Sequence, residues 1–159
     1  MFKINRKLEY ALISLRHMSS KAPGQLSSAK EICDIYHTPF DPTSRVLQIM
    51  AQNEIVRAEQ GAHGGYQILK DLSKITLFDL TQIIEGPIKI VNCFHGNYSN
   101  CDMTSQCNVI SPMLNLNERL SELFKTINVR DLISSRNQGE RQIRTKHFMQ
   151  GVEVVSKVI

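Results

Sequence analysis

The start of the chain has the periodicity of an amphipathic helix. In residues 6–20 the apolar positions recur three and four residues apart, which places them on one helical face. These positions are Leu8, Ala11, Leu12, Leu15 and Met18. Asn5 is a suitable N-cap, and Pro23 with Gly24 marks the end. The first predicted element is therefore a helix.

Two further short helices are predicted before residue 55. Ser27 or Ser28 can cap the second, with Glu31 placed to complete a capping box. Its inward positions are Ala29, Ile32, Cys33 and Tyr36. After a break at residues 37–39, Asp41 as N-cap and Pro42 at the first helical position predict the third helix. Its buried face should comprise Val46, Leu47, Ile49 and Met50.

The pattern then changes to that of strands before helices resume. IVRAEQ and YQILK flank the glycine-rich GAHGG, which predicts a β-hairpin. Thr76 and Asp79 form a capping pair for a helix that continues to Glu85. Ser111 and Pro112 then predict the start of a long helix, about 112–128. Its apolar stripe comprises Met113, Leu116, Leu120, Leu123, Phe124 and Ile127.

This order of elements predicts a mainly α fold with a small β-hairpin, a winged helix-turn-helix domain followed by a long dimerisation helix. In such a module the second helix of the pair lies in the DNA major groove. A small α+β core with a surface hairpin is the alternative that the pattern leaves open. The expected segments are a DNA-binding domain at 1–88, a cysteine loop at 89–110, dimerisation helices at 111–134 and an extension of unknown role at 135–159.

Composition limits the classes of function. The apolar content of 42% and charged content of 21% are those of a soluble globular protein. No apolar run approaches the roughly 18 residues that span a bilayer, and no signal-peptide pattern is present, so we expect a cytoplasmic protein. The net charge of +4 is evenly spread and is weak evidence for nucleic-acid binding. No nucleophile–base pair, phosphate loop or paired-carboxylate site is evident, so we do not expect an enzyme.

Candidate DNA contacts follow from the predicted module. Thr43, Ser44 and Arg45 should be exposed in the first turn of the third helix, and Arg45 can pair with a guanine edge. Each residue taken singly is equally consistent with an ordinary surface position. The other candidates are Lys3, Arg6 and Lys7 near the N-terminus, Arg57 on the first strand, and Gln60, Gly61, His63, Gly64 and Gly65 at the wing.

Three of the four cysteines lie in one polar segment, NCFHGNYSNCDMTSQCN, at residues 92–108. Cys93, Cys101 and Cys107 have few apolar neighbours to pack against, whereas Cys33 fits a small buried residue. Three thiolates can bind a soft metal centre. An iron–sulfur cluster would need one further ligand, and zinc prefers four. An iron–sulfur cluster, zinc and unligated thiols all remain open on this chemistry.

The chain resembles the bacterial transcription regulators of the Rrf-two type over about residues 1–134. The motifs that carry the resemblance are LEYAL, AKEICDIYHTPFDPTSRVLQIMAQNEIV, GAHGGYQILKD, ITLFDLTQIIEG and the three-cysteine loop. It implies a homodimeric repressor or activator, with a repressor favoured, that binds a palindromic double-stranded operator. The resemblance also implies sensing of redox, nitric oxide or iron status through an iron–sulfur cluster. The long helix would cross that of the partner subunit.

The resemblance assigns Cys93, Cys101 and Cys107 as ligands of this cluster, with 4Fe–4S favoured and 2Fe–2S as the alternative. Some members place a histidine three residues after the third cysteine, but this chain has Ile110 there. Others use a carboxylate from the other subunit, which corresponds to Glu9 of the partner subunit. His95 is the alternative within the loop.

Two positions depart from the family's usual residues. The family often has Arg where this chain has Gln60, and an aromatic where it has Pro42, so this chain should not be assumed to bind the operator sequence of a relative.

Two rival functions are compatible with the sequence. One rival is a winged-helix regulator with a thiol or zinc switch and no iron–sulfur cluster. The other is an iron–sulfur carrier that does not bind DNA.

Overall fold

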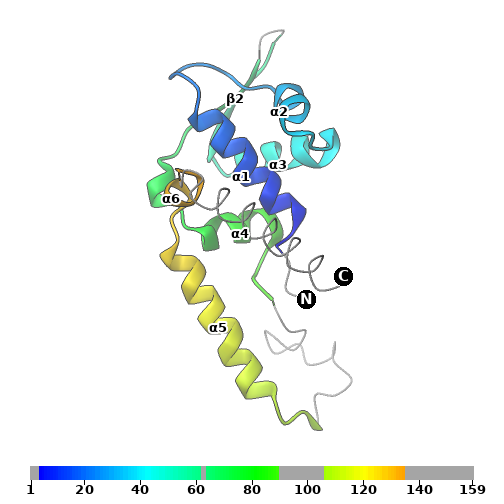
Figure 1. Ribbon diagram of the computed structural model, residues 1–159, viewed down its shortest axis with the longest axis vertical. Helices are drawn as coiled ribbons and strands as arrows, with labels where there is room; N and C mark the ends of the chain where they lie inside the picture. The colour runs from blue at the N-terminus through cyan, green and yellow to red at the C-terminus, as the bar shows by residue number, and fades with distance from the viewer. Residues whose placement is uncertain (1–3, 62–63, 90–105, 135–159) are drawn as a thin grey trace, which may run out of the picture.

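The computed structural model describes residues 4–61, 64–89 and 106–134; the C-terminal extension predicted at 135–159 lies outside them. The chain is mainly helical with one two-stranded antiparallel sheet, which confirms the predicted fold class. Figure 1 shows the hairpin at one end of the molecule and α5 extending from the other. The elements are α1 (Arg6–Ser19), α2 (Ala29–Tyr36), α3 (Phe40–Gln52), β1 (Val56–Glu59), β2 (Gly65–Ile68), η1 (Leu72–Lys74), α4 (Leu77–Glu85), α5 (Ile110–Thr126) and α6 (Val129–Ser134).

Helix α1 forms the centre of the core and contacts α2, α3 and α4. Its predicted cap is confirmed, because Asn5 Oδ1 accepts a hydrogen bond from the Lys7 backbone at 3.1 Å. Most of the predicted apolar face is buried, and Leu12 is partly buried. The buried members of the face are Leu8, Ala11, Leu15 and Met18. Periodicity therefore identified the central helix and its inward side correctly.

The predicted hairpin is confirmed, with Val56 opposite Ile68 and Glu59 opposite Gly65. The two strands extend away from α4 (Figure 1). The base of the hairpin is tied to the segment before α2, because Ser27 and Tyr66 exchange two backbone hydrogen bonds of 2.9 Å. A Cβ atom at Gly65 would lie 2.8 Å from Ser27 O, so this close approach requires glycine.

The predicted capping pair of α4 is confirmed as a complete capping box. Asp79 N donates to Thr76 Oγ1 at 3.1 Å, and Thr76 N donates to Asp79 Oδ2 at 3.0 Å. The same start of α4 is joined to the link between α5 and α6. Leu77 N donates to Ile127 O at 2.7 Å, so the end of α5 is fixed to the core.

Helix α5 begins at Ile110, before the predicted cap at Ser111, and that prediction is wrong. Val109 is the N-cap without a side-chain hydrogen bond, and Pro112 lies in the first turn, where a backbone N–H has no intrahelical acceptor. The apolar stripe divides between two environments. Phe124 is 8% exposed against α4 and the core, whereas Leu116 and Leu123 are 50% and 53% exposed.

Candidate nucleic-acid interface and cysteine segment

The turn between α2 and α3 sets the start of the candidate recognition helix. His37 adopts a left-handed conformation with φ of 53°, and Pro39 is extended. Helix α3 therefore begins at Phe40, and the prediction of Asp41 as N-cap with Pro42 at the first position is wrong. Proline is tolerated in this first turn because its missing N–H would have no intrahelical acceptor. An aromatic residue, Phe40, thus starts the helix and is 54% exposed.

Thr43 lies inside the helix-turn-helix rather than on its surface, so its predicted exposure is wrong. Its side chain is fully buried, and its Oγ1 donates to Thr38 Oγ1 at 3.1 Å. Thr38 Oγ1 in turn lies 3.5 Å from Cys33 Sγ, and Cys33 is buried as predicted. This chain of polar contacts links α2, the turn and α3, because each hydroxyl needs a partner when removed from water.

Glu31 connects α2 to α1. Ser28 Oγ caps α2 as predicted by accepting from Glu31 N at 3.1 Å, but the Glu31 carboxylate does not complete the capping box. Instead it lies 2.7 Å from Lys21 Nζ and 3.2 Å from His17 Nε2. The hydrogen bond from Lys21 holds the pKa of Glu31 below its usual value. Tyr36, predicted to face inward, is 42% exposed; its hydroxyl lies 3.3 Å from His17 Nδ1, and its ring meets the His17 ring edge-on with the centroids 5.6 Å apart.

Replacing Glu31 by Gln should lower the free energy of unfolding by about 1 kcal/mol at neutral pH, because Lys21 loses a charged acceptor. Since the pKa of Glu31 is lowered in the folded protein, the ionised carboxylate stabilises the fold at pH values above the usual pKa of 4.5. That stabilisation is lost as the pH falls through the lowered pKa. Thermal unfolding followed by circular dichroism should show that the difference in unfolding temperature between wild type and Glu31→Gln becomes smaller in acid. Asp34→Asn on the exposed side of α2 is the control, and a gap independent of pH would contradict this account.

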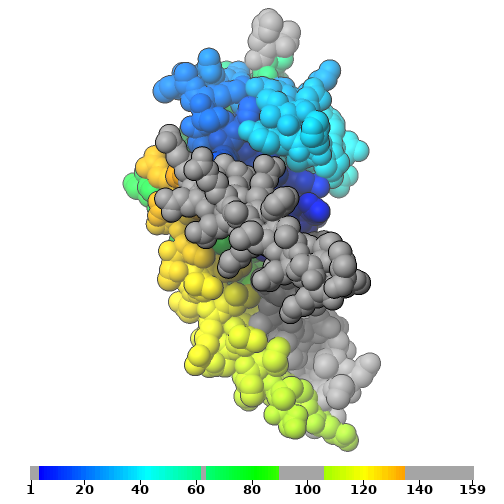
Figure 2. Space-filling view, in the orientation of Figure 1, coloured from blue at the N-terminus to red at the C-terminus, as the bar shows by residue number. Residues whose placement is uncertain are grey.

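The outward side of α3 and the start of α1 together line a hollow of about 750 Å³. Figure 2 shows the cyan surface of α3 above the dark blue start of α1. Arg45 and Gln48 are both exposed, and their separation of three residues places them on one helical face. The residues that line the hollow include Lys7, Phe40, Asp41, Ser44, Arg45 and Gln48. Guanidinium and carboxamide groups are those that pair with guanine and adenine edges.

Sequence reasoning identified part of this surface. It named Ser44, Arg45 and Lys7 but not Phe40 or Gln48, which the hollow places beside them. The three-residue spacing from Arg45 could have identified Gln48. Phe40 was missed because the helix start was predicted two residues too late.

The wing lies beside α3, since β1 packs against that helix. Arg57 is exposed on β1, with its Nε 3.8 Å from Glu59 Oε1. Gln60 and Gly61 are exposed at the tip, and the φ of 123° at Gly61 favours glycine. Gly64 is half-buried, and His63 lies outside the described residues. The described wing thus presents one arginine and glycine-rich backbone next to the recognition helix.

The N-terminal candidates lie at the start of α1. Arg6 is exposed, and its guanidinium lies 3.0 Å from Glu9 Oε2. Glu9 is half-buried near the start of α1, and one oxygen of its carboxylate accepts the hydrogen bond from Arg6. Lys3 lies outside the described residues.

Of the predicted cluster ligands, the structure describes Cys107 and Glu9. Cys107 is a free, half-buried thiol three residues before α5. Cys93, Cys101 and His95 lie outside the described residues. Within residues 4–61, 64–89 and 106–134, no three His, Cys, Asp or Glu side chains gather to hold a metal ion. The donor set itself fits an iron–sulfur group, because thiolates are its usual ligands.

A helix-turn-helix pair with an adjacent wing defines the winged-helix class of transcription regulators. The sequence matches the Rrf2 family, described as iron-dependent transcriptional regulators, over residues 4–135. This match covers every element described above. The chain therefore belongs to the Rrf2 family of winged-helix, DNA-binding regulators. In the described part of the chain, no helix has the length and apolar character needed to cross a membrane.

Similar proteins include regulators that carry different names. The transcriptional regulator NsrR of Bacillus subtilis is 24% identical over 151 residues, covering 91% of this chain and 99% of that protein. Among solved structures, CymR, the global cysteine regulator of B. subtilis, has a TM-score of 0.64 at 20% identity, covering 86% of this chain and all of that one. The IscR of T. potens has a TM-score of 0.58 at 18% identity, with 89% and 96% covered. These structures share the fold, and the named relatives are regulators rather than enzymes.

Proposed function

We propose that this chain is a cytoplasmic, homodimeric transcriptional repressor that senses iron, nitric oxide or redox status through an iron–sulfur cluster. The observation that carries the DNA-binding part is the exposed face of α3, where Arg45 and Gln48 lie beside Lys7 and the wing. A guanidinium and a carboxamide on one face suit the major groove, and Lys7 and Arg57 suit backbone phosphates. The partner is therefore double-stranded DNA with a palindromic operator, matching a two-fold symmetric dimer.

Exposed apolar side chains on α5 support the dimer. Val109, Leu116 and Leu123 are each separated by seven residues, so they lie along one side of the helix start and α5. All three are half or more exposed in the single chain. Apolar residues repeated every seven positions form the seam between paired helices. Packing α5 against α5 of a second copy would remove this surface from water.

Cys93, Cys101 and Cys107 would hold the cluster, with Glu9 of the partner subunit favoured as fourth ligand and His95 as the alternative. The cluster would be 4Fe–4S, or 2Fe–2S, and when bound it would supply an iron open to reaction with nitric oxide or oxygen. Cys107 lies just before α5, and the far end of α5 is hydrogen-bonded to the start of α4. Helix α4 contacts both α1 and α3. A change at Cys107 can therefore reach the recognition helix through packed, hydrogen-bonded elements.

A thiol switch at the same cysteines is the second candidate. It is favoured by the fold shared with CymR, including an oxidised form from Staphylococcus aureus with a TM-score of 0.63. Anaerobic purification separates the two candidates. A brown protein containing iron and sulfide supports the cluster, whereas a colourless protein that forms disulfides on oxidation supports the thiol switch.

Operator binding tests the function as a whole. A DNA site selected from random sequence by the anaerobically purified protein should be bound with an affinity that falls steeply as salt rises, because phosphate contacts release counterions. Exposure of the protein to nitric oxide should weaken binding to that site at fixed salt. Failure to bind any DNA site with salt-dependent affinity would exclude a DNA-binding role, and equal affinity before and after nitric oxide would exclude a nitric-oxide switch.

Arg45→Ala should weaken binding to the selected operator by about tenfold or more, corresponding to the roughly 1–3 kcal/mol of a bidentate base contact. Repeating the selection with the variant should show relaxed preference at one base pair. Lys7→Ala is the comparison variant, because loss of a phosphate contact should weaken binding to all DNA sequences equally. If Arg45→Ala behaves like Lys7→Ala, Arg45 contacts phosphate rather than a base.

A further inference from the structure

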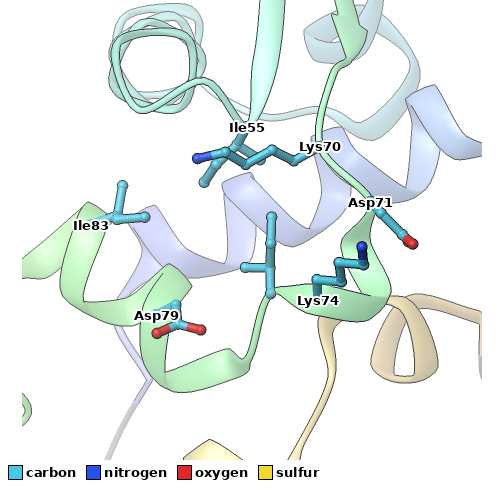
Figure 3. A pocket seen from close by; sticks show the side chains of 7 residues that line it. Ile55, Lys70, Asp71, Lys74, Asp79 and Ile83 are labelled. Carbon is cyan, nitrogen blue, oxygen red and sulfur yellow. The ribbon is translucent and has the colours of Figure 1, made fainter.

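A cavity of about 430 Å³ lies between the base of the wing, η1 and α4, away from the candidate DNA-binding face. Its apolar part is formed by Ile55, Ile75 and Ile83, of which the first two are buried. Its charged rim comprises Lys70, Asp71, Lys74 and Asp79. Figure 3 shows Lys70 extending across the cavity, whereas the Asp71 carboxylate points away from the isoleucines. The volume is in the range of small-molecule sites.

The two carboxylates of the rim are already engaged by the protein. Asp71 Oδ1 accepts hydrogen bonds from Ser73 N at 3.0 Å and Ser73 Oγ at 2.8 Å, and Arg130 lies 3.7 Å away. Asp79 Oδ2 accepts two hydrogen bonds from Thr76 as part of the capping box of α4. Their negative charge is therefore largely balanced by local donors and the helix start.

The ammonium groups of the two rim lysines retain unused hydrogen-bond donors. Lys70 Nζ donates to the backbone carbonyl of Asn53 at 3.0 Å, which leaves two of its three donors for other partners. Among the described residues, the Lys74 ammonium has no hydrogen bond and no ion pair within 4 Å, although its charge contributes to lowering the pKa of the neighbouring Asp71 carboxyl. The cavity thus combines an apolar floor with two ammonium groups that retain capacity for an anion.

We propose that this cavity binds a small organic anion, an aliphatic carboxylate whose branched body contacts the isoleucines. Its carboxylate would accept hydrogen bonds from Lys70 and Lys74, which lie on the two sides of the Asp71 turn. A ligand held in this way contacts the wing base, η1 and α4 at once. The proposal concerns binding alone, so it stands or fails independently of the proposed DNA-binding function.

Calorimetric titration of the full chain, without DNA, tests the site with 3-methylbutanoate as probe. We expect saturable binding below about 10 mM, with the neutral 3-methylbutanamide bound about tenfold more weakly because it lacks the charge-assisted hydrogen bonds. Acetate should also bind about tenfold more weakly, since it lacks the apolar body. Failure to saturate below about 10 mM, or equal binding of acid and amide, would overturn the proposal.

Lys74→Met is the matched variant, because methionine keeps an apolar stem while removing the ammonium group. The Lys74→Met variant should bind 3-methylbutanoate about tenfold more weakly without a change in the far-ultraviolet circular dichroism spectrum. Lys30→Met, an exposed site on α2 outside the cavity, changes the net charge equally and should bind like wild type. An unchanged affinity in Lys74→Met, or the same loss in both variants, would show that the cavity lysine does not hold the ligand.

Discussion

Leu116→Glu combined with Leu123→Glu should convert the protein to a monomer and weaken operator binding by at least about a hundredfold. Both leucines are half exposed on the same side of α5 and separated by seven residues. In the proposed dimer each would pack against the partner helix, where a glutamate would be desolvated without a counterion. Loss of the dimer removes the second recognition helix, so the gain from binding two half-sites together disappears.

Analytical ultracentrifugation measures the loss of the dimer, and operator titration measures the loss of DNA affinity. Because both positions are exposed in the single chain, circular dichroism should show an intact fold in the double variant. Leu69→Glu is the matched control, since Leu69 is a similarly exposed leucine outside α5 and should leave the dimer intact. A double variant that remains dimeric would mean that α5 does not form the interface.

Replacing Cys93, Cys101 and Cys107 together by Ser should give a colourless protein that contains no iron or sulfide after anaerobic purification. Serine removes the thiolates, which are the usual ligands of an iron–sulfur cluster. Operator binding by this variant should no longer respond to nitric oxide. The winged-helix domain should remain folded, because its core is built from residues outside the cysteine segment.

Cys33→Ser is the control for that experiment. Cys33 is buried on α2 beside Thr38, so its replacement should affect stability but leave the iron and sulfide content unchanged. Absorption spectra, metal analysis and operator titration before and after nitric oxide provide the readouts. A triple variant that keeps its colour or its response to nitric oxide would exclude these cysteines as cluster ligands.

The elements that could be predicted from sequence are those whose determinants are close in the chain. The capping box of Thr76 and Asp79 spans four residues, so its pattern is sufficient to place the start of α4. The Asn5 cap and the periodicity of α1 are similarly local. The hairpin follows from two apolar segments that flank a glycine-rich turn.

The errors arose where a side chain had several potential partners. Glu31 has the position required for a capping box, but Lys21 and His17 of the preceding segment approach its carboxylate in the folded chain. Thr43 has the spacing of an exposed first-turn residue. The left-handed turn at His37 starts α3 earlier and rotates Thr43 inward to Thr38.

The sequence by itself determined the fold class through periodicity and local turn and cap motifs, and it pointed to the cysteine segment through the spacing of its thiols. Its resemblance to known regulators indicated the family and the sensing role of that segment. Only the tertiary structure decided that Gln48 and Lys7 share a hollow with Arg45, and that Lys70 and Lys74 lie at one cavity. It also decided which leucines of α5 remain exposed and which contribute to the core. The physical reason is that burial and side-chain pairing depend on contacts between segments distant in the chain, and local patterns do not specify those contacts.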